Sequence, residues 1–433
     1  MSVQQSDPTP TDNVHALPAA ETRRHRSGFW VVAFAFLIVM ASATLPSPLY
    51  GLYRTRDHLS ALTVTVIYAI FAGGTIAALL SVRFIAARAG RRGVMLGAVA
   101  TMMAAAGLLA AWKALPGLLI GRLITGVSVG LAAGTAIIYL IELRGRANPS
   151  ASPIRARNIG TAVNVGALGI GPLIAGCLAE WVKHPLTLPY LLFVALGAIA
   201  LIGLATAPET GAPAPPASAD GQASSSSRSV RVLVPGAAAT LAAFSANGLF
   251  AGLSGLFLAT TLHHPSHALS GATLFLVFTA GVASQLATNG LPASRVFVLG
   301  TISMLVGLAL LVTAVRLSTP SLVLFLVGGA LIGAGAGAVF KGTTGLVLEA
   351  TAPENRLAMT SDLLIALFVG LSIPVIGAGV ALDRGASAPD TVLGFAILVG
   401  LGVTGAGALL GHGLQRGQRP AGASSIKAPH API

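Results

Sequence analysis

The sequence predicts an all-α integral membrane protein with twelve transmembrane helices, arranged as two parallel repeats of six. Hydrophobic residues make up 54% of the 433 residues and charged residues only 9%, whereas about a quarter of a soluble domain is charged. Apolar runs long enough to cross a bilayer recur along the whole chain. Similar residues also recur at a nearly constant offset between its two halves. So few charges could not cover the apolar surface of a soluble fold.

Twelve apolar runs reach the roughly 17 to 25 residues that cross the hydrocarbon core of a bilayer. Each must be a helix, because an isolated strand would leave its backbone N–H and C=O groups unsatisfied in lipid. The chain has 52 glycines, many of them inside these runs, where close helix packing favours small residues. The predicted spans are 28–53, 61–86, 93–112, 117–142, 158–181, 186–207, 233–262, 269–291, 295–315, 320–347, 357–382 and 391–414.

The first span also has features of a cleaved signal peptide. Basic residues at 23–26 precede an apolar stretch that ends at Ala41-Ser42-Ala43, which imitates a cleavage site. We interpret it as an uncleaved helix, because the residues just past Ala43 take part in the internal repeat.

Loop charges predict the orientation of the chain in the cell membrane. With the N-terminus in the cytoplasm, the inner segments hold eighteen Lys and Arg residues and the outer segments six. Cytoplasmic loops carry the excess of positive charge in membrane proteins. Both termini are therefore predicted to be cytoplasmic.

The same spacing of charges argues against a nucleic-acid partner. The 26 Lys and Arg residues outnumber the 13 Asp and Glu residues, but they lie singly or in short groups between apolar runs. A nucleic-acid site would gather them on one soluble face.

Metal, cofactor and enzyme sites are not expected. The single cysteine, Cys177, excludes an internal disulfide and a cysteine-cluster metal site. Pro265 interrupts the helical spacing of His263, His264 and His267, which have no carboxylate beside them in the sequence. The chain has no phosphate-binding loop and no convincing pair of nucleophile and base.

The predicted spans divide the chain into two bundles and three polar segments. Residues 1–27 form a disordered cytoplasmic tail and residues 28–207 a bundle of six helices. The Pro- and Ser-rich residues 208–232 are predicted to be a flexible cytoplasmic linker. A second six-helix bundle covers 233–415, and 416–433 form a cytoplasmic tail.

Three pairs of spans support a duplication. Two six-helix halves repeated in parallel place a binding site at their interface, near the middle of the bilayer. The matches are Leu45, Leu49, Gly51, Leu52 and Tyr53 of span 1 with Leu249, Leu253, Gly255, Leu256 and Phe257 of span 7 (offset 204), Gly126, Gly130 and Glu142 of span 4 with Gly333, Gly337 and Glu349 of span 10 (offset 207), and Pro172 of span 5 with Pro374 of span 11 (offset 202).

Short patterns that combine basic residues, glycine and proline stand at four places in the first half. They are Arg88-Ala89-Gly90-Arg91-Arg92 between spans 2 and 3, Arg122 with Gly126, Gly130 and Gly134 in span 4, Gly169, Gly171-Pro172 and Gly176 in span 5, and Pro208-Glu209-Thr210 after span 6.

With six plus six spans around a central loop, these patterns resemble the major facilitator superfamily of secondary transporters. The first is similar to the end of the family's loop motif, although Arg83 and Ala87 stand where the full motif has Gly and Asp. The pattern at Arg122 is similar to the motif that carries a membrane-embedded arginine. Gly171-Pro172 resembles a motif seen mainly in exporters.

The resemblance implies a transporter whose halves rock around a cavity lined by spans 1, 4, 7 and 10. We expect a monomeric secondary active transporter in the lipid bilayer that exports a small amphiphilic molecule as a proton antiporter, by alternating access. A proton-linked importer of a small metabolite or organic anion is the nearest alternative. A non-transporting membrane sensor on the same fold is the alternative from another class.

Ionisable residues in or near the spans are the main site candidates, because lipid makes buried charge costly. Arg122 either supplies a fixed positive charge to the cavity or reaches the outer headgroups. Glu142 and Glu349 lie at equivalent inner ends and either carry protons or pair with neighbouring arginines. Lys341 and Asp362 could pair at an inner gate, or Lys341 could reach the cytoplasm.

Neutral polar side chains are the other candidates, because no acidic residue lies in span 1 or in the middle of any other span. They could contact a neutral or weakly anionic substrate, or hold the helices together by hydrogen bonds. These residues are Ser47, Tyr50, Tyr53, Asn164, Asn247 and Gln285.

Overall fold

The computed structural model describes residues 19–150, 152–210, 227–352 and 355–418, and within them it contains helices and no strand. Twelve segments of this part of the chain are long and apolar enough to cross a membrane, which confirms the predicted number. The helices are α1 (Ala19–Thr44), η1 (Ser47–Leu49), α2 (Tyr50–Asp57), α3 (Ala61–Ala111), α4 (Leu115–Ala133), α5 (Ala136–Ala147), α6 (Pro153–Trp181), α7 (Leu188–Thr206), α8 (Ser227–Thr260), α9 (His267–Ala287), α10 (Ala293–Arg316), α11 (Leu322–Glu349), α12 (Arg356–Asp383) and α13 (Ala388–Gln418).

The structure divides two of the predicted spans and joins two others. Span 1 is interrupted between α1 and η1, where Pro46 and Pro48 lack the N–H groups that would continue the helix. Span 4 is divided between α4 and α5, after Gly134. Spans 2 and 3 are joined without a loop as α3, which is interrupted at Gly90 by a backbone with φ 70° and ψ 175°.

The predicted tails and linker differ from the observed helices at their edges. Helix α1 begins at Ala19, inside the predicted tail 1–27, and α13 continues to Gln418. Helix α8 begins at Ser227, inside the predicted linker 208–232. Residues 1–18, 211–226 and 419–433 lie outside the described residues.

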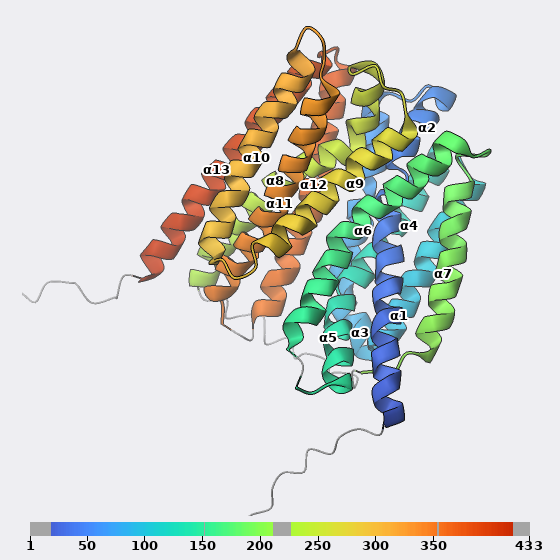
Figure 1. The fold of residues 1–433 in the computed structure, drawn as a ribbon, viewed down its shortest axis with the longest axis vertical. Coiled ribbons are helices and arrows are strands. Elements are labelled where there is room, and N and C mark those ends of the chain that lie inside the picture. Colours follow the sequence, from blue (N-terminus) through green and yellow to red (C-terminus); the bar gives the residue numbers. More distant parts are fainter. Residues whose placement is uncertain (1–18, 151, 211–226, 353–354, 419–433) are drawn as a thin grey trace, which may run out of the picture.

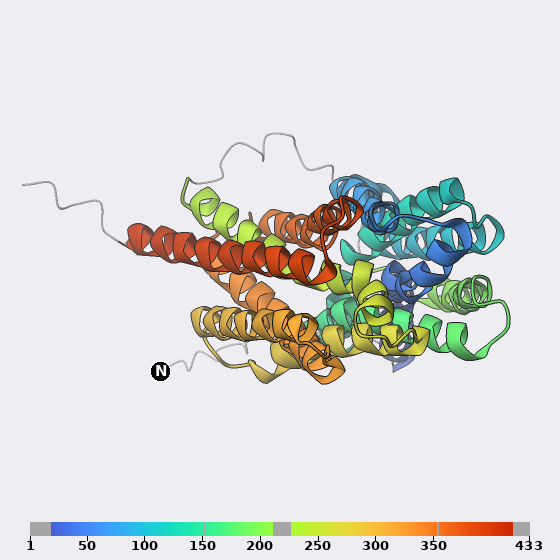
Figure 2. The same cartoon turned by 90° about the horizontal axis from the view of Figure 1, so that it is seen from above.

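The two halves of the chain lie side by side as two groups of helices (Figures 1 and 2). The main contacts between the halves pair α6 with α9 and α3 with α12, and smaller contacts join η1 to α8 and α9 and α2 to α8. The halves come together at the end where α9 begins and spread apart towards the end where α1 begins and α13 ends (Figure 1). We call these the sealed end and the terminal end.

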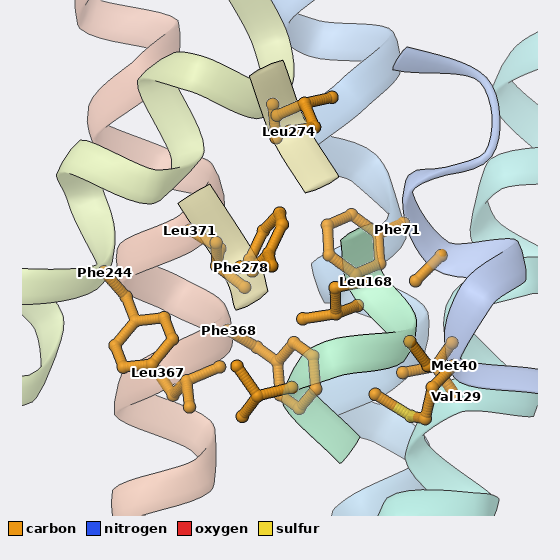
Figure 3. Packing of buried hydrophobic residues seen from close by; sticks show 14 of the residues in the cluster. Met40, Phe71, Val129, Leu168, Phe244, Leu274, Phe278, Leu367, Phe368 and Leu371 are labelled. Atoms are coloured by element: carbon orange, nitrogen blue, oxygen red, sulfur yellow. The ribbon is translucent and has the colours of Figure 1, made fainter. Parts of the chain in front are cut away.

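Apolar side chains fill the contact between the halves. Phe71 and Leu168 from the first half lie beside Phe278 and Phe368 from the second (Figure 3). The rings of Phe71 and Phe368 meet edge to face, with their centroids 6.2 Å apart. Within a membrane such packing is stabilised mainly by van der Waals contact, because lipid tails are as apolar as these side chains.

The predicted duplication is visible in the packing of the helices. A Cβ atom on Gly126 of α4 would overlap the carbonyl oxygen of Phe71 in span 2. A Cβ atom on Gly333 of α11 would overlap the carbonyl oxygen of Val277 in α9 in the same way. The two glycines match at an offset of 207, and Phe71 and Val277 match at an offset of 206. In each half, a glycine therefore lets the fourth span pack closely against the second.

Candidate functional site

Arg122 lies on α4 with only 1% of its surface exposed. Its Nη1 donates a hydrogen bond to the carbonyl oxygen of Ala43 (2.6 Å), and its Nη2 donates to that of Tyr68 (3.3 Å). The guanidinium carbon lies 4.8 Å from the centroid of the Phe71 ring. The side chain is therefore held inside the first half, and it does not reach the surface that the headgroup alternative requires.

The break in span 1 explains why Arg122 binds at this point. Helix α1 ends at Thr44, so the carbonyl of Ala43 belongs to the last turn, where carbonyls lack partners within the helix. The last turn also carries the negative end of the helix dipole, which favours a positive charge. The hydroxyl of Thr44 donates to the carbonyl of Leu168 (2.6 Å) and fixes the same turn against α6.

Three tyrosines surround this guanidinium. Tyr50, Tyr68 and Tyr190 all lie within electrostatic range of Arg122. The hydroxyls of Tyr53 and Tyr190 are hydrogen-bonded to each other (3.2 Å), whereas those of Tyr50 and Tyr68 are buried without a partner. The site thus combines one buried cation with two buried phenols whose hydroxyls have no hydrogen-bond partner among the described residues.

The predicted neutral residues are buried, and most have unused hydrogen-bonding capacity. A buried polar atom without a partner costs about 1 to 3 kcal/mol, so such atoms are normally explained by water or ligand. Tyr53 is the exception, because its hydroxyl contacts that of Tyr190. The atoms without a partner are Ser47 Oγ, Tyr50 Oη, Asn164 Oδ1, Asn247 Oδ1 and Gln285 Nε2.

A pocket of about 460 Å³ lies between the halves at the sealed end. It is lined by α2 and the start of α3 from the first half and by α8 from the second. Tyr50 and Arg54 line it from one side and Thr260 from the other. Tyr50 therefore lines this pocket and also lies within electrostatic range of the buried guanidinium.

The predicted loop motif forms a charged cluster at the terminal end. Arg91 donates from Nε to both carboxylate oxygens of Glu142 (3.0 and 2.9 Å), and Thr210 donates to the same carboxylate (2.6 Å). The carboxylate of Glu209 accepts hydrogen bonds from the backbone N–H groups of Arg91 and Arg92 (both 3.0 Å). Glu142 therefore pairs with the loop motif rather than with its sequence neighbour Arg144.

The second half does not repeat this cluster in the described residues. Glu349, the repeat equivalent of Glu142, is exposed at the end of α11. Lys341 donates from Nζ to the carbonyl of Gln285 (2.5 Å) and to Asn289 Oδ1 (2.8 Å), at the end of α9. Asp362 is exposed near the start of α12, and its pairing with Lys341 stays a prediction.

Two acidic residues at the sealed end were not among the predicted site residues. Glu180, at the end of α6, accepts hydrogen bonds from the backbone of His267 (2.7 Å) and Ala268 (3.3 Å) at the start of α9. Asp383, at the end of α12, accepts one from the backbone of Ala61 at the start of α3 (3.0 Å). Both contacts join the two halves. Their offset of 203 in the sequence is the signal that could have identified them.

The comparisons with known proteins agree with this architecture. Residues 32–292 match the family described as Major Facilitator Superfamily. No curated protein matches the sequence. The fold is similar to that of the nucleoside transporter NupG, with a TM-score of 0.67, 12% identity and coverage of 89% of this chain and 99% of that chain. It is also similar to a bacterial homologue of the human lysosomal transporter Spinster in an inward-facing and occupied conformation, with a TM-score of 0.67, 13% identity and coverage of 89% and 96%.

Proposed function

Because the chain belongs to the Major Facilitator Superfamily, a family of secondary transporters rather than enzymes, we propose that it carries a small organic anion across the cell membrane. Alternating access of the two halves moves the substrate, and Arg122 supplies the positive charge that binds it. Tyr50 and Tyr68 donate hydrogen bonds to the same anion. We infer the class of substrate and the chemistry of its site from the residues around Arg122. The similar structures support only the fold.

The observation that carries this proposal is the burial of Arg122 without a carboxylate. Its hydrogen bonds go to two backbone carbonyls, and its buried Nε has no partner. None of the three ion pairs among the described residues includes it. A buried charge without a counter-ion costs several kcal/mol. An anionic substrate would provide the missing negative charge during each cycle.

The same observation suggests how a proton takes part. A cation exporter needs a carboxylate in its cavity, and here Glu142 is bound by Arg91 and Thr210 at the terminal end. We therefore propose symport, in which a proton crosses together with the anion that Arg122 binds. Anion and proton then cross together without net charge.

The orientation of the chain is part of the proposal. The excess of Lys and Arg in the predicted inner segments supports a cytoplasmic terminal end and a sealed end that faces outward. The two halves diverge towards the terminal end (Figure 1), and this arrangement supports an inward-facing state as part of the proposal. A cysteine in place of Gly145, with Cys177 replaced by serine, tests the orientation. A membrane-impermeant maleimide should label it in everted vesicles and leave it unlabelled in intact cells.

The transport assay uses proteoliposomes with an imposed pH gradient and a panel of small organic anions, amines and neutral solutes. Arg122→Gln removes the charge, Arg122→Lys keeps it, and Arg316→Gln removes a charge from an exposed pair with Asp390. Breaking a buried charge contact costs about 2 to 5 kcal/mol, so kcat/KM for an anion should fall about thirtyfold or more in Arg122→Gln.

The outcomes distinguish transport of an anion from transport of an amine and from loss of fold. Anion-dependent proton movement that Arg122→Gln abolishes and Arg122→Lys partly restores supports the proposal, provided that Arg316→Gln transports like the parent. Transport of amines by Arg122→Gln at the parent rate would refute the anionic substrate. Size-exclusion profiles and melting midpoints of the variants show whether loss of transport reflects loss of fold.

Proton-coupled efflux of a small amphiphilic compound is the second candidate. Gly171-Pro172 in span 5 favours it, because the resembling motif occurs mainly in exporters. In this chain a Cβ atom on Gly171 would overlap the carbonyl oxygen of Ala41, so the motif brings α6 into backbone contact with α1 beside the Arg122 site. Proton movement out of the vesicle lumen when amphiphilic cations are added outside, with anions inactive, would favour this function over anion transport.

A further inference from the structure

The sealed end is closed by hydrogen bonds that cross from one half to the other. The side chain of Glu180 leaves the end of α6 and accepts from Ser266 Oγ (3.2 Å) and from the first backbone N–H groups of α9. The side chain of Asp383 leaves the end of α12 and accepts from the backbone of Ala61, the first residue of α3 (3.0 Å). The hydrogen bonds that the structure describes between the halves all lie at this end, where His267 Nδ1 also contacts the carbonyl of Pro48 (3.2 Å).

The two carboxylate contacts are the same contact in the two repeats. Glu180 and Asp383 match at an offset of 203. The receiving helices begin with equivalent N-cap residues, Ser60 for α3 and Ser266 for α9, which match at an offset of 206. The first half therefore caps a helix of the second half, and the second half caps the equivalent helix of the first.

Close backbone contacts lie one turn from each carboxylate. A Cβ atom on Gly176 would overlap the carbonyl oxygen of His267 and come within 3.2 Å of Gly271 Cα. A Cβ atom on Gly379 would come within 3.0 Å of Leu62 Cα and overlap the side chain of Thr65. Gly176 and Gly379 also match at an offset of 203. Each carboxylate can reach the opposite helix only when these glycines are in contact.

We propose that Glu180 and Asp383 are a symmetric pair of positioning residues that hold the sealed end closed and release together when it opens. A carboxylate at a helix N-terminus is stabilised by free N–H groups and by the positive end of the helix dipole. Both carboxylates are exposed, so water replaces the helix as their partner when the halves separate. The contact is therefore weak enough to break in every cycle.

The equivalent positions of the Glu180 and Asp383 contacts in the two halves affect how the sealed end opens. Rocking one half against the other opens a sealed end on both sides of the interface at once. The Glu180 contact lies between α6 and α9, and the Asp383 contact lies between α12 and α3. These two helix pairs form the main contacts between the halves. This proposal concerns the balance between the two states of the transporter, and it does not depend on the substrate being an anion.

Distances between spin labels in lipid nanodiscs, without substrate, test the proposal. The labels replace Gly107 and Gly394 for the sealed end and, in a second protein, Gly145 and Gly411 for the terminal end. A Cβ atom at each of these four positions meets no other atom within 4 Å. Both proteins carry Cys177→Ser, which removes the single native cysteine.

The variants are Glu180→Gln, Asp383→Asn and their combination. Each substitution removes the charge that the helix dipole stabilises and leaves an amide oxygen as acceptor, so it should raise the population with a wide sealed end by about two- to fivefold. The double variant should raise this population by about the product of the two single effects, because the Glu180 and Asp383 contacts do not touch each other. The terminal end should narrow in the same samples, since the halves rock as rigid bodies.

Asp390→Asn is the matched control. Asp390 also lies at the sealed end, but it binds Arg316 and Ser387 of its own half. It should leave both distance distributions unchanged. An unchanged sealed end in the double variant would overturn the proposal, and so would an equal effect of Asp390→Asn. Simultaneous broadening at both ends would also overturn it, because it would indicate loss of structure rather than release of the Glu180 and Asp383 contacts.

Discussion

Gly90→Ala tests the local structure that joins spans 2 and 3 to the end of span 6. Gly90 has φ 70° and ψ 175°, a backbone conformation that residues with a side chain rarely adopt. A Cβ atom there would lie 2.6 Å from Glu209 Oε2 and 2.8 Å from the carboxyl carbon. The substitution therefore strains the backbone and displaces the carboxylate that caps Arg91 and Arg92.

The expected cost follows from these two effects. Backbone strain of this kind costs about 1 to 3 kcal/mol, and loss of a helix cap about 1 kcal/mol, so we expect about 2 to 4 kcal/mol of destabilisation. An unfolding entropy of roughly 2.1 cal/mol/K per residue converts this into a fall of about 2 to 4 °C in the melting midpoint of a chain of 433 residues.

The assay is thermal unfolding of the purified protein in mild detergent, with Gly97→Ala as the control. Gly97 lies on the same helix, and a Cβ atom there meets nothing within 4 Å. Gly97→Ala should melt at or slightly above the parent temperature. Adding Glu209→Gln to Gly90→Ala should cost little more, because the cap is already lost. A parent-like midpoint for Gly90→Ala would refute the assigned strain and cap.

Three further tests, with five substitutions between them, address contacts within the first half. Gly126→Ala should sharply lower the yield of monodisperse protein in size exclusion, because its Cβ atom would overlap a backbone oxygen of span 2; a normal yield would contradict this packing. Arg91→Gln and Glu142→Gln in a double-mutant cycle should give a coupling free energy of about 1 kcal/mol in chemical unfolding, since the pair is partly exposed. A coupling of zero would show that this ion pair does not stabilise the fold. Tyr53→Phe should lower the melting midpoint by leaving the Tyr190 hydroxyl unpaired, and Tyr190→Phe in addition should restore most of the loss; a further fall would show another role for that hydroxyl.

Composition and apolar run length were sufficient to predict the helices of this fold. Twelve spans follow from them because lipid requires helices of a fixed minimum length. The interruptions in spans 1 and 4 were not predicted. Pro46 and Pro48 stand in an apolar run that is long enough for a continuous helix, and only the structure shows how contacts of Arg122 with Ala43 and of Thr44 with Leu168 stabilise the break.

The candidate site was predicted in part. The position of Arg122 inside a predicted span identified it as a candidate. Its neighbours Tyr68 and Tyr190 come from spans 2 and 6, and nothing in the sequence relates those positions to span 4. Glu180 was overlooked because it lies at a helix end, where an acidic residue is ordinarily solvated. Its contact with α9 depends on how the two halves meet, which short motifs do not encode.

The contact of Glu209 with Arg91 and Arg92 has a consequence for biosynthesis. The carboxylate that caps the helix of span 3 is made about 118 residues after the backbone that it caps. While spans 4 to 6 emerge from the ribosome, that helix start must be solvated at the membrane surface. The first bundle acquires its final form only after residues 209 and 210 have been synthesised, so a chain that ends inside span 6 would lack both Glu209 and the Thr210 contact with Glu142.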